Sequence, residues 1–347
     1  MKACVLHGIG DLRLEEVKDS VPGRGEVLIK IKASGICGSD IPRVFTKGTY
    51  HFPTIPGHEF SGVIVERGED VEPSLVGRKA AVFPLIPCRR CGACQVGEYA
   101  QCKDYNYFGS RCDGGFAEYI AVPVWNAVLV PDNLSYEEAA MAEPAAVAVH
   151  ALRQVGIEIG DYVAVFGAGP IGLILGQWAR AWGAHEVIMI DIDEQKIAFA
   201  EKQGFCHGID SSKTDPVEYI NAITHGRGVD VAVEGTGVGA ALERCLYSVR
   251  PFGRLVAMGN PAGDIHLSQK GYWELLRKQI TIKGTWNSSF ATFPKDDWQL
   301  AINAMESGQL RVGSLITHRI SIDQVWDTLN MMKDKKAFYN KVMITFD

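Results

Sequence analysis

Apolar and polar positions alternate in the first part of the chain. Within residues 26–32, the side chains of Val27, Ile29 and Ile31 would share one face of a strand. Glycine and proline then interrupt the following stretch at short intervals, at Pro53, Pro56, Gly57, Gly62, Gly68, Gly77, Pro84, Pro87, Gly114 and Gly115. Frequent turn residues keep each element short, so this part predicts a β-rich domain with few helices.

The pattern changes near Ala139. Residues 139–155 have an Ala-rich helical composition that Glu143 and Pro144 interrupt. Beyond them, short apolar runs rich in β-branched residues predict strands, and the stretches between these runs predict helices. The expected strands are 162–166, 187–190, 229–233, 254–258 and 280–282, and the expected helices are 170–182, 194–203, 239–249 and 271–278. This alternation predicts an α/β domain with a parallel sheet covered on both faces.

The last part of the chain is expected to return to the first domain. It contains an amphipathic helix near 296–306 and a final strand at 342–344. The predicted organisation is therefore a first domain over 1–150, a second over 151–285 and a return segment over 286–347. No internal repeat or low-complexity stretch interrupts it.

Composition limits the possible partners. The chain has 347 residues, 47% of them hydrophobic and 22% charged, with a net charge of -6. A modestly acidic chain without a basic block argues against nucleic acid or an anionic membrane as the main partner. The N-terminal residues include His7 and Asp11 and lack a secretory pattern, and no apolar stretch is long enough to span a bilayer. We expect a cytoplasmic protein.

A glycine-rich loop follows the strand predicted at 162–166. It reads Gly167-Ala168-Gly169-Pro170-Ile171-Gly172 and opens a predicted helix. Glycines at these positions permit a tight turn, a close approach of the backbone to a pyrophosphate, and close packing of helix on strand. The helix N-terminus supplies free N–H groups for the phosphates. The loop therefore predicts a dinucleotide site of the Rossmann type.

Asp191 ends the next predicted strand, at the position of the acidic residue in this fingerprint. Its carboxylate would accept hydrogen bonds from the adenosine ribose and repel a 2′-phosphate. The residues that follow it, Ile192 and Asp193, offer no positive charge. NAD is therefore expected in preference to NADP.

Four of the nine cysteines lie close together as Cys88-x2-Cys91-x2-Cys94-x7-Cys102. Four thiolates can surround one zinc ion tetrahedrally and leave no open position, which defines a structural site. Arg89, Arg90 and Lys103 lie beside them in sequence and would offset the negative charge. Iron–sulfur clusters use related spacings, but nothing else in the sequence indicates electron transfer.

A second metal site is indicated by Cys37 and by His58 with Glu59, in two short glycine-bounded segments. An isolated Cys and His would be weak evidence. A predicted NAD site on the same chain strengthens it, because hydride removal from an alcohol also requires loss of the alcohol proton. An open zinc ion assists that loss as a Lewis acid. Glu59 and Glu143 are both candidates for the third ligand.

Taken together, these motifs resemble the zinc-dependent medium-chain alcohol and polyol dehydrogenases. The resemblance covers nearly the whole chain and includes Gly35-Ile-Cys37-Gly-Ser-Asp40, Gly57-His58-Glu59-Phe60-Ser61-Gly62, the four-cysteine loop, Gly114-Gly115-Phe116-Ala117-Glu118-Tyr119, Glu143-Pro144 and the glycine-rich loop. It implies a GroES-like catalytic domain and a Rossmann domain, with the active site in the cleft between them. Glu at position 143, where alcohol dehydrogenases carry Cys, resembles the polyol branch.

The resemblance also implies roles for individual residues. Cys37, His58 and Glu143 would bind the catalytic zinc, with Glu59 as a nearby exchanging carboxylate. Cys88, Cys91, Cys94 and Cys102 would hold the structural zinc. Pro42 stands where sorbitol dehydrogenases usually carry a His, which leaves Ser39, a zinc-bound water and Glu59 as candidate proton carriers.

The expected reaction is oxidation of a secondary alcohol of a sugar alcohol, with hydride transfer to NAD. Arg43 and Lys47 are hypothesised to hold a substrate phosphate, because arginine binds phosphate through two parallel donors. Alternative substrates are sorbitol, ribitol 5-phosphate, butanediol and threonine, and an alternative of another class is a dinucleotide-binding protein without catalysis. We expect a homodimer or homotetramer, with an apolar strand near 280–286 that would extend a sheet across the interface.

Overall fold

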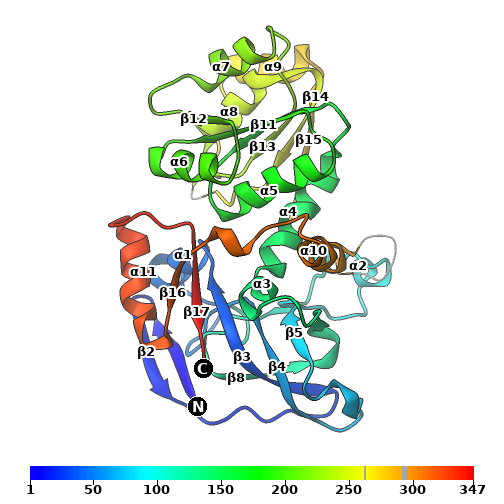
Figure 1. The fold of residues 1–347 in the computed structure, drawn as a ribbon, viewed down its shortest axis with the longest axis vertical. Coiled ribbons are helices and arrows are strands. Elements are labelled where there is room, and N and C mark those ends of the chain that lie inside the picture. Colours follow the sequence, from blue (N-terminus) through cyan, green and yellow to red (C-terminus); the bar gives the residue numbers. More distant parts are fainter. Residues whose placement is uncertain (262, 291–295) are drawn as a thin grey trace. The chain divides into compact units, whose positions relative to one another are not determined.

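The computed structural model describes residues 1–261, 263–290 and 296–347. These residues form two compact units, Met1–Pro144 with Ser289–Asp347, and Ala145–Ser288. The chain leaves the first unit once and returns to it, as Figure 1 shows by colour. The sequence predicts boundaries between these units after residues 150 and 285, and the structure places them after Pro144 and Ser288.

The second unit is built on a six-stranded parallel sheet. Its strand order is β12-β11-β10-β13-β14-β15, the order of a doubly wound dinucleotide-binding fold. Strands and helices alternate along the chain as β10 (Tyr162–Phe166), α5 (Pro170–Ala181), β11 (Glu186–Asp191), α6 (Glu194–Lys202), β12 (His207–Asp210), α7 (Pro216–Ile223), β13 (Val229–Glu234), α8 (Gly239–Ser248), β14 (Val249–Ala257), α9 (Gln269–Arg277) and β15 (Thr281–Gly284). The predicted parallel α/β sheet is confirmed.

The central strands of this sheet are buried on both faces. Val163, Ala164 and Val165 of β10 have no exposed surface, and all six residues of β13 are buried. Continuous apolar runs of this kind are typical of parallel strands covered by helices. The strand β12 and the helix α7 were not predicted, because His207-Gly208-Ile209-Asp210 lacks the apolar run that marks the other strands.

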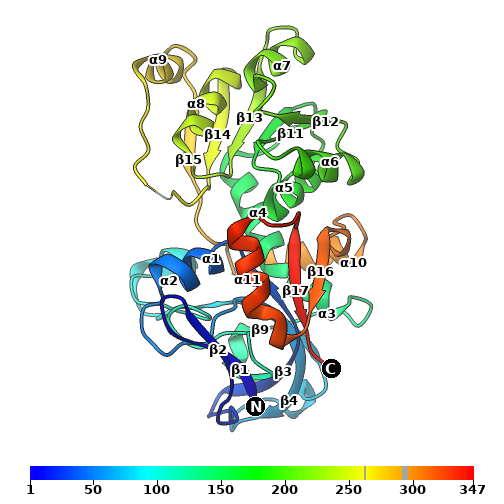
Figure 2. The ribbon, with the colours of Figure 1, turned by 90° about the vertical axis from the view of Figure 1, so that its left-hand side faces the viewer.

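The first unit is built on a mainly antiparallel sheet, seen beside α11 in Figure 2. Its strand order is β16-β17-β3-β4-β5-β9, with β8 also paired to β3. Its main elements are β1 (Lys2–Gly8), β2 (Asp11–Glu16), β3 (Glu26–Ile36), α1 (Asp40–Pro42), η1 (Arg43–Lys47), β4 (Glu59–Arg67), β5 (Lys79–Val82), β6 (Leu85–Ile86), α2 (Gly92–Gln95), β7 (Asn106–Tyr107), β8 (Tyr119–Pro123), β9 (Ala127–Leu129), α3 (Tyr136–Ala140), α10 (Asp297–Glu306), β16 (Ile316–Ile320), α11 (Val325–Asp334) and β17 (Lys341–Thr345). The β-rich first domain is confirmed, and Val27, Ile29 and Ile31 are fully buried.

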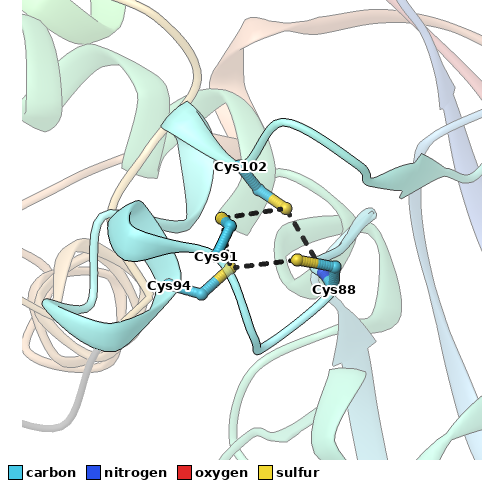
Figure 3. Close-up of side chains that lie close together, drawn as sticks. All are labelled: Cys88, Cys91, Cys94 and Cys102. Atoms are coloured by element: carbon cyan, nitrogen blue, oxygen red, sulfur yellow. Dashed lines mark hydrogen bonds between the residues drawn. The ribbon is translucent and has the colours of Figure 1, made fainter.

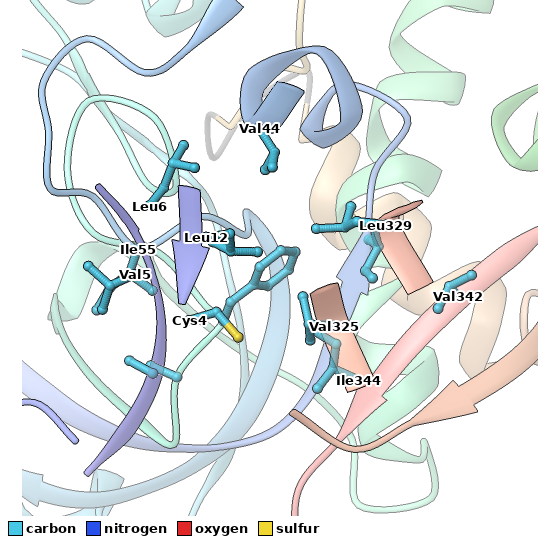
Figure 4. Packing of buried hydrophobic residues seen from close by; sticks show 14 of the residues in the cluster. Cys4, Val5, Leu6, Leu12, Val44, Ile55, Val325, Leu329, Val342 and Ile344 are labelled. Carbon is cyan, nitrogen blue, oxygen red and sulfur yellow. The ribbon is translucent and has the colours of Figure 1, made fainter. Parts of the chain in front are cut away.

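The C-terminal segment completes this unit. Strand β17 pairs antiparallel with β3, so that Met343 lies opposite Gly35. Val342 and Ile344 of β17 and Val325 and Leu329 of α11 pack in one apolar cluster with residues of the N-terminal strands, as Figure 4 shows. The ends of the chain therefore share a core.

The Ala-rich stretch predicted over 139–155 forms two helices. Helix α3 ends at Ala140 and α4 (Ala142–Val155) begins after Met141, so the break precedes Glu143 and Pro144 rather than falling on them. Pro144 lies in the first turn of α4, where a missing N–H removes no helical hydrogen bond. Among the described residues, no helix combines the length and the apolar character that a bilayer crossing requires.

Candidate active site and metal centres

Strand pairing brings together three of the predicted metal-binding side chains. Cys37 directly follows β3, and Glu59 is the first residue of β4, where it lies opposite Gly35. One donor atom each from Cys37, His58 and Glu59 lies within 4.8 Å of the others. His58 and Glu59 are buried, at 4% and 1% exposure. Antiparallel register thus joins segments twenty residues apart in the sequence.

Asp40 contacts two of these three residues, Cys37 and His58. Its buried carboxylate accepts a hydrogen bond from the Cys37 N–H at 2.9 Å and from Arg43 Nη1 at 2.6 Å. Burial favours the neutral acid, but the neighbouring His58 ring and Arg43 guanidinium lower the pKa of Asp40 to about 2. Asp40 is therefore a fixed negative charge beside His58.

The His58 ring is oriented by that charge. His58 Nδ1 lies 3.6 Å from Asp40 Oδ1, and this buried nitrogen has no hydrogen-bond partner among the described residues. Burial opposes the imidazolium, yet the Asp40 carboxylate raises the pKa of His58 well above its usual value. With Nδ1 directed at Asp40, Nε2 is the nitrogen left for a metal ion. A carboxylate behind a metal-binding His is a common supporting arrangement.

Lys341 is a functional-site residue that the sequence did not predict. Its ammonium group is 2% exposed and bonds to Glu59 Oε2 and to the Ile36 carbonyl. Burial lowers the pKa of Lys341, but the negative charges of Glu59 and Cys37 outweigh it and leave that pKa raised. A Cβ at Gly35 would lie 2.4 Å from Glu59 Oε2 and 2.9 Å from Lys341 Cε, so a side chain at this position would displace the pair from its observed geometry.

Glu143 lies outside the group of three donors. Its carboxylate is 7% exposed, and its Oε1 accepts a hydrogen bond from the Tyr107 hydroxyl at 3.4 Å. The Tyr107 ring also lies 5.8 Å from the His58 ring, centroid to centroid. Burial, with the nearby Glu59, raises the pKa of Glu143 to about 7 against the opposing effect of His58. The resemblance implied Glu143 as the ligand and Glu59 as the exchanging group, whereas the geometry groups Glu59 with Cys37 and His58.

The donor set suits an open zinc site. Thiolate, imidazole and carboxylate are the three donor types that zinc accepts, and catalytic sites use three protein ligands with one free position. The mutual approach of the three donor atoms and the fixed negative charge of Asp40 behind His58 both favour a cation at this place. These residues therefore fit the ion that the sequence predicts.

The other predicted residues of this site lie on the segment after Cys37. Ser39 is half-buried, and its hydroxyl makes no hydrogen bond to any described residue. Arg43 belongs to the π-helical turn η1, and its guanidinium bonds to Asp40. Lys47 ends that turn and is exposed. The phosphate-binding role of Arg43 and Lys47 stays a prediction.

The four cysteines of the loop form a compact cluster. Figure 3 shows the thiol groups of Cys88, Cys91, Cys94 and Cys102 directed toward one another. The Sγ–Sγ distances are 3.5 Å for Cys91–Cys94, 3.9 Å for Cys91–Cys102 and 4.0 Å for Cys88–Cys94. Zn–S bonds of about 2.3 Å in a tetrahedron place sulfur atoms about 3.8 Å apart. The spacing therefore fits one zinc ion with no free position.

The basic residues beside this cluster have other partners. Arg89 stacks on the Trp125 ring at 4.5 Å, and Arg90 pairs with Asp104 at 2.9 Å. Backbone N–H groups lower the pKa of the Cys91 thiol to about 6, led by that of Cys94. Burial raises the pKa of the Cys94 thiol to about 12, so this backbone effect concerns Cys91 in particular. The charge-offsetting role of Arg89, Arg90 and Lys103 stays a prediction.

The glycine-rich loop of the second unit has the predicted context. It joins β10 to α5, with Gly169 as the N-cap and Pro170 as the first helical residue. A Cβ at Gly172 would lie 1.8 Å from the Gly167 carbonyl oxygen, whereas one at Gly169 would meet nothing within 4 Å. The loop is therefore tightly packed on its inner side and open at Gly169, where a pyrophosphate would approach.

Asp191 ends β11 beside this loop. Its Oδ2 accepts the Ala168 N–H at 2.9 Å and its Oδ1 accepts the Asp193 N–H at 3.1 Å. Lys196 Nζ lies 3.9 Å from Asp191 Oδ2. The sequence has no positive charge at Ile192 and Asp193, but the Lys196 ammonium group, three residues further on, lies beside the Asp191 carboxylate.

Comparisons with known proteins agree with the fold and the metal centres. Residues 23–132 match the family model of the alcohol dehydrogenase GroES-like domain, and residues 170–307 match that of zinc-binding dehydrogenases. The chain is 35% identical to galactitol 1-phosphate 5-dehydrogenase of Escherichia coli K12, over 93% of this chain and 94% of that protein. It is 36% identical to sorbitol dehydrogenase of Bacillus subtilis, over 99% and 97%.

The solved structures give the same result. The crystal structure of galactitol-1-phosphate dehydrogenase from Escherichia coli matches with a TM-score of 0.92 at 34% identity, over 100% of both chains. The chain therefore belongs to the zinc-dependent medium-chain alcohol and polyol dehydrogenases, a family of oxidoreductases. The cofactors of this family are zinc and NAD(P), and its polyol branch acts on small-molecule sugar alcohols.

Proposed function

We propose that this protein oxidises a secondary alcohol of a sugar alcohol phosphate with NAD, and that its substrate is galactitol 1-phosphate, which yields tagatose 6-phosphate. The observation that carries the proposal is the grouping of Cys37 with the buried His58 and Glu59 in a chain with a Rossmann dinucleotide loop. The similarity to galactitol 1-phosphate 5-dehydrogenase over nearly the whole chain supports the substrate.

The chain's own residues account for several requirements of this chemistry. Cys37, His58 and Glu59 would hold the zinc ion, which when bound lowers the pKa of the alcohol as a Lewis acid. The Ser39 hydroxyl, which has no other partner in the described chain, would accept the alcohol proton and pass it outward. Glu59 could carry a proton only when it is exchanged from the metal, and the hydrogen bond between Tyr107 and Glu143 adds polar groups beside it.

Arg43 and Lys47 are the proposed phosphate ligands. Arg43→Ala tests this role through KM for galactitol 1-phosphate and for galactitol. A selective rise with the phosphorylated substrate would support a phosphate contact. Equal rises with both would indicate that Arg43 acts only through its bond to Asp40.

NAD is the proposed nucleotide, because Asp191 places a carboxylate at the end of β11, where a 2′-phosphate would meet it. The active form is proposed to be a cytoplasmic homodimer or homotetramer, with the exposed edge strand β15 at the interface. Unpaired edge strands favour pairing with another chain.

The experiment is NADH formation by the zinc-loaded protein with a panel of polyols and polyol phosphates. The proposal predicts the highest kcat/KM with galactitol 1-phosphate. The 36% identity to a sorbitol dehydrogenase makes sorbitol the second candidate, and a higher kcat/KM with sorbitol would select it. Absence of NADH formation with every compound, both with zinc and after zinc removal, would instead favour a non-catalytic dinucleotide-binding protein.

A further inference from the structure

Arg111 lies between two aromatic rings of the first unit. Its guanidinium carbon is 3.9 Å from the centroid of the Tyr50 ring and 4.3 Å from that of Tyr105. Stacking covers the flat faces of a guanidinium and leaves the N–H groups at its edge. The rings therefore fix the plane of the side chain while its donors stay available to a ligand.

The positive charge of Arg111 is not neutralised by the protein. No carboxylate lies within ion-pair distance of its side chain in residues 1–261, 263–290 and 296–347. The acidic residues near it in sequence have other partners, since Asp104 pairs with Arg90 and Asp113 accepts the Ile55 N–H. Arg43 differs, because its guanidinium already bonds to Asp40. Arg111 is thus a half-buried, pre-oriented cation without a counter-ion.

Arg111 belongs to the turn that carries Tyr107 to the metal centre. The Arg111 N–H donates to the Tyr107 carbonyl at 2.9 Å. The Tyr107 side chain contacts Glu143 and lies beside the His58 ring. The two ends of this short turn therefore carry an active-site side chain and an unpaired guanidinium.

The turn is held rigidly against the segment that bears His58. A Cβ at Gly109 would lie 2.5 Å from the Gly57 carbonyl oxygen, and one at Gly114 would lie 2.0 Å from the same atom. On the other side, the Tyr50 N–H donates to the Ser110 carbonyl at 3.1 Å. These backbone contacts fix the position of Arg111 relative to the metal ligands.

We propose that Arg111 binds the phosphate group of the polyol phosphate alongside the contacts proposed for Arg43 and Lys47, and that it strengthens the preference for phosphorylated over unphosphorylated substrates. This inference rests on the proposed function and names its specificity residue. Two adjacent N–H donors on a fixed edge match two phosphate oxygens. Tyr50 and Tyr105 are positioning residues, since they hold the guanidinium without offering it a charge.

The test is steady-state kinetics of the zinc-loaded enzyme with galactitol 1-phosphate and with galactitol at saturating NAD. Arg111→Gln is expected to raise KM for the phosphorylated substrate roughly 10- to 100-fold, the effect of losing charge-assisted hydrogen bonds. KM for galactitol is expected to stay within about twofold of the wild type, because galactitol has no phosphate group to contact Arg111. Both kcat values are also expected to stay within about twofold of the wild type, because the contact lies away from the reacting alcohol. Arg111→Lys keeps the charge but not the paired donors and should give an intermediate KM.

Arg180→Gln is the matched control. Arg180 also stacks on an aromatic ring, that of Phe205 at 4.2 Å, but lies in the second unit at the end of α5. It should change neither KM. Equal KM changes with the two substrates in Arg111→Gln, or a wild-type preference for galactitol, would overturn the inference.

A binding measurement separates this inference from the proposed function. Galactitol 1-phosphate, but not galactitol, should protect Arg111 from modification by phenylglyoxal, read by peptide mass spectrometry. If the wild-type protein oxidises neither compound but the phosphate ester still protects Arg111, the proposed function fails and the anion site stands. Absence of protection in an enzyme that oxidises the phosphate ester would overturn the role of Arg111 alone.

Discussion

Two buried carboxylates, Glu59 and Glu143, lie beside one thiol and one imidazole. Only the Glu59 carboxylate lies within 4.8 Å of the Cys37 and His58 donor atoms. We expect Glu59→Gln to lose the zinc of the open site, so that metal content falls from about two to about one ion per chain, because an amide is a poor zinc ligand. Glu143→Gln should retain both ions.

Metal analysis of the two purified variants shows whether Glu59 or Glu143 is the third ligand of the zinc ion. Loss of zinc from Glu143→Gln and its retention in Glu59→Gln would show that Glu143 is the ligand, as the family resemblance implies. The four-cysteine site provides an internal reference, since neither substitution touches its donors.

Asp230 is a buried carboxylate that stabilises the second unit. It accepts hydrogen bonds from Arg250 Nε at 2.5 Å, Arg227 Nη2 at 2.5 Å and the Tyr162 N–H at 2.8 Å. Burial raises its pKa, but these donors outweigh burial and leave the pKa lowered in the folded state. The ionised form is therefore the one that folding favours.

The lowered pKa of Asp230 in the folded state determines how the stability of the protein depends on pH. The contribution of Asp230 is complete above its unfolded pKa of about 3.9 and is lost as pH falls through the lower folded pKa. We expect Asp230→Asn to reduce the free energy of unfolding by about 1–3 kcal/mol near neutral pH, with the difference shrinking in acid. Urea unfolding at several pH values measures this, and a difference independent of pH would contradict it.

The four-cysteine loop is an element built around a proposed structural zinc site. Its Arg89 stacks on Trp125, and Trp125 in turn packs against Phe83 at 5.8 Å and Tyr99 at 5.2 Å. We expect removal of zinc by a chelator to change the tryptophan fluorescence and to lower Tm by several degrees. Trp125→Phe should abolish most of the fluorescence change but not the fall in Tm. An unchanged Tm would contradict a structural role for this zinc.

The end of β11 is the proposed determinant of the choice between NAD and NADP. Asp191 faces the loop at Ala168, and Lys196 Nζ lies 3.9 Å from its carboxylate. We expect Asp191→Ala to lower kcat/KM with NAD and raise it with NADP, changing their ratio by roughly tenfold or more, because the repulsion of the 2′-phosphate is removed. Lys196→Ala in the same background should remove the gain with NADP. An unchanged ratio would exclude Asp191 as the discriminating residue.

At the scale of the whole chain, local motifs were sufficient for much of the fold. Apart from β12 and α7, the order of strands and helices over 162–284 follows from apolar runs, and the four-cysteine site follows from the spacing of its donors. Lys341 could not be predicted, because its contact with Glu59 depends on the pairing of β17 with β3 from opposite ends of the chain. A lysine in a short apolar strand carries no sequence signal of that register.

The roles of the charged residues near Cys37 were also beyond the sequence. Arg43 was expected to face a phosphate, and its bond to the buried Asp40 follows from the π-helical turn η1. The sequence assigns no role to Arg111, and its stacking between Tyr50 and Tyr105 becomes visible only in three dimensions. Side chains that neutralise or orient others depend on packing between distant segments.

The central claim is zinc-dependent oxidation of a polyol phosphate by NAD. The most direct measurement is NADH formation with galactitol 1-phosphate before zinc removal, after removal, and after zinc is restored. The account predicts activity that is lost with the metal and regained with it, and a Cys37→Ser variant that stays inactive throughout. Equal NADH formation by the zinc-free and zinc-loaded protein would contradict it.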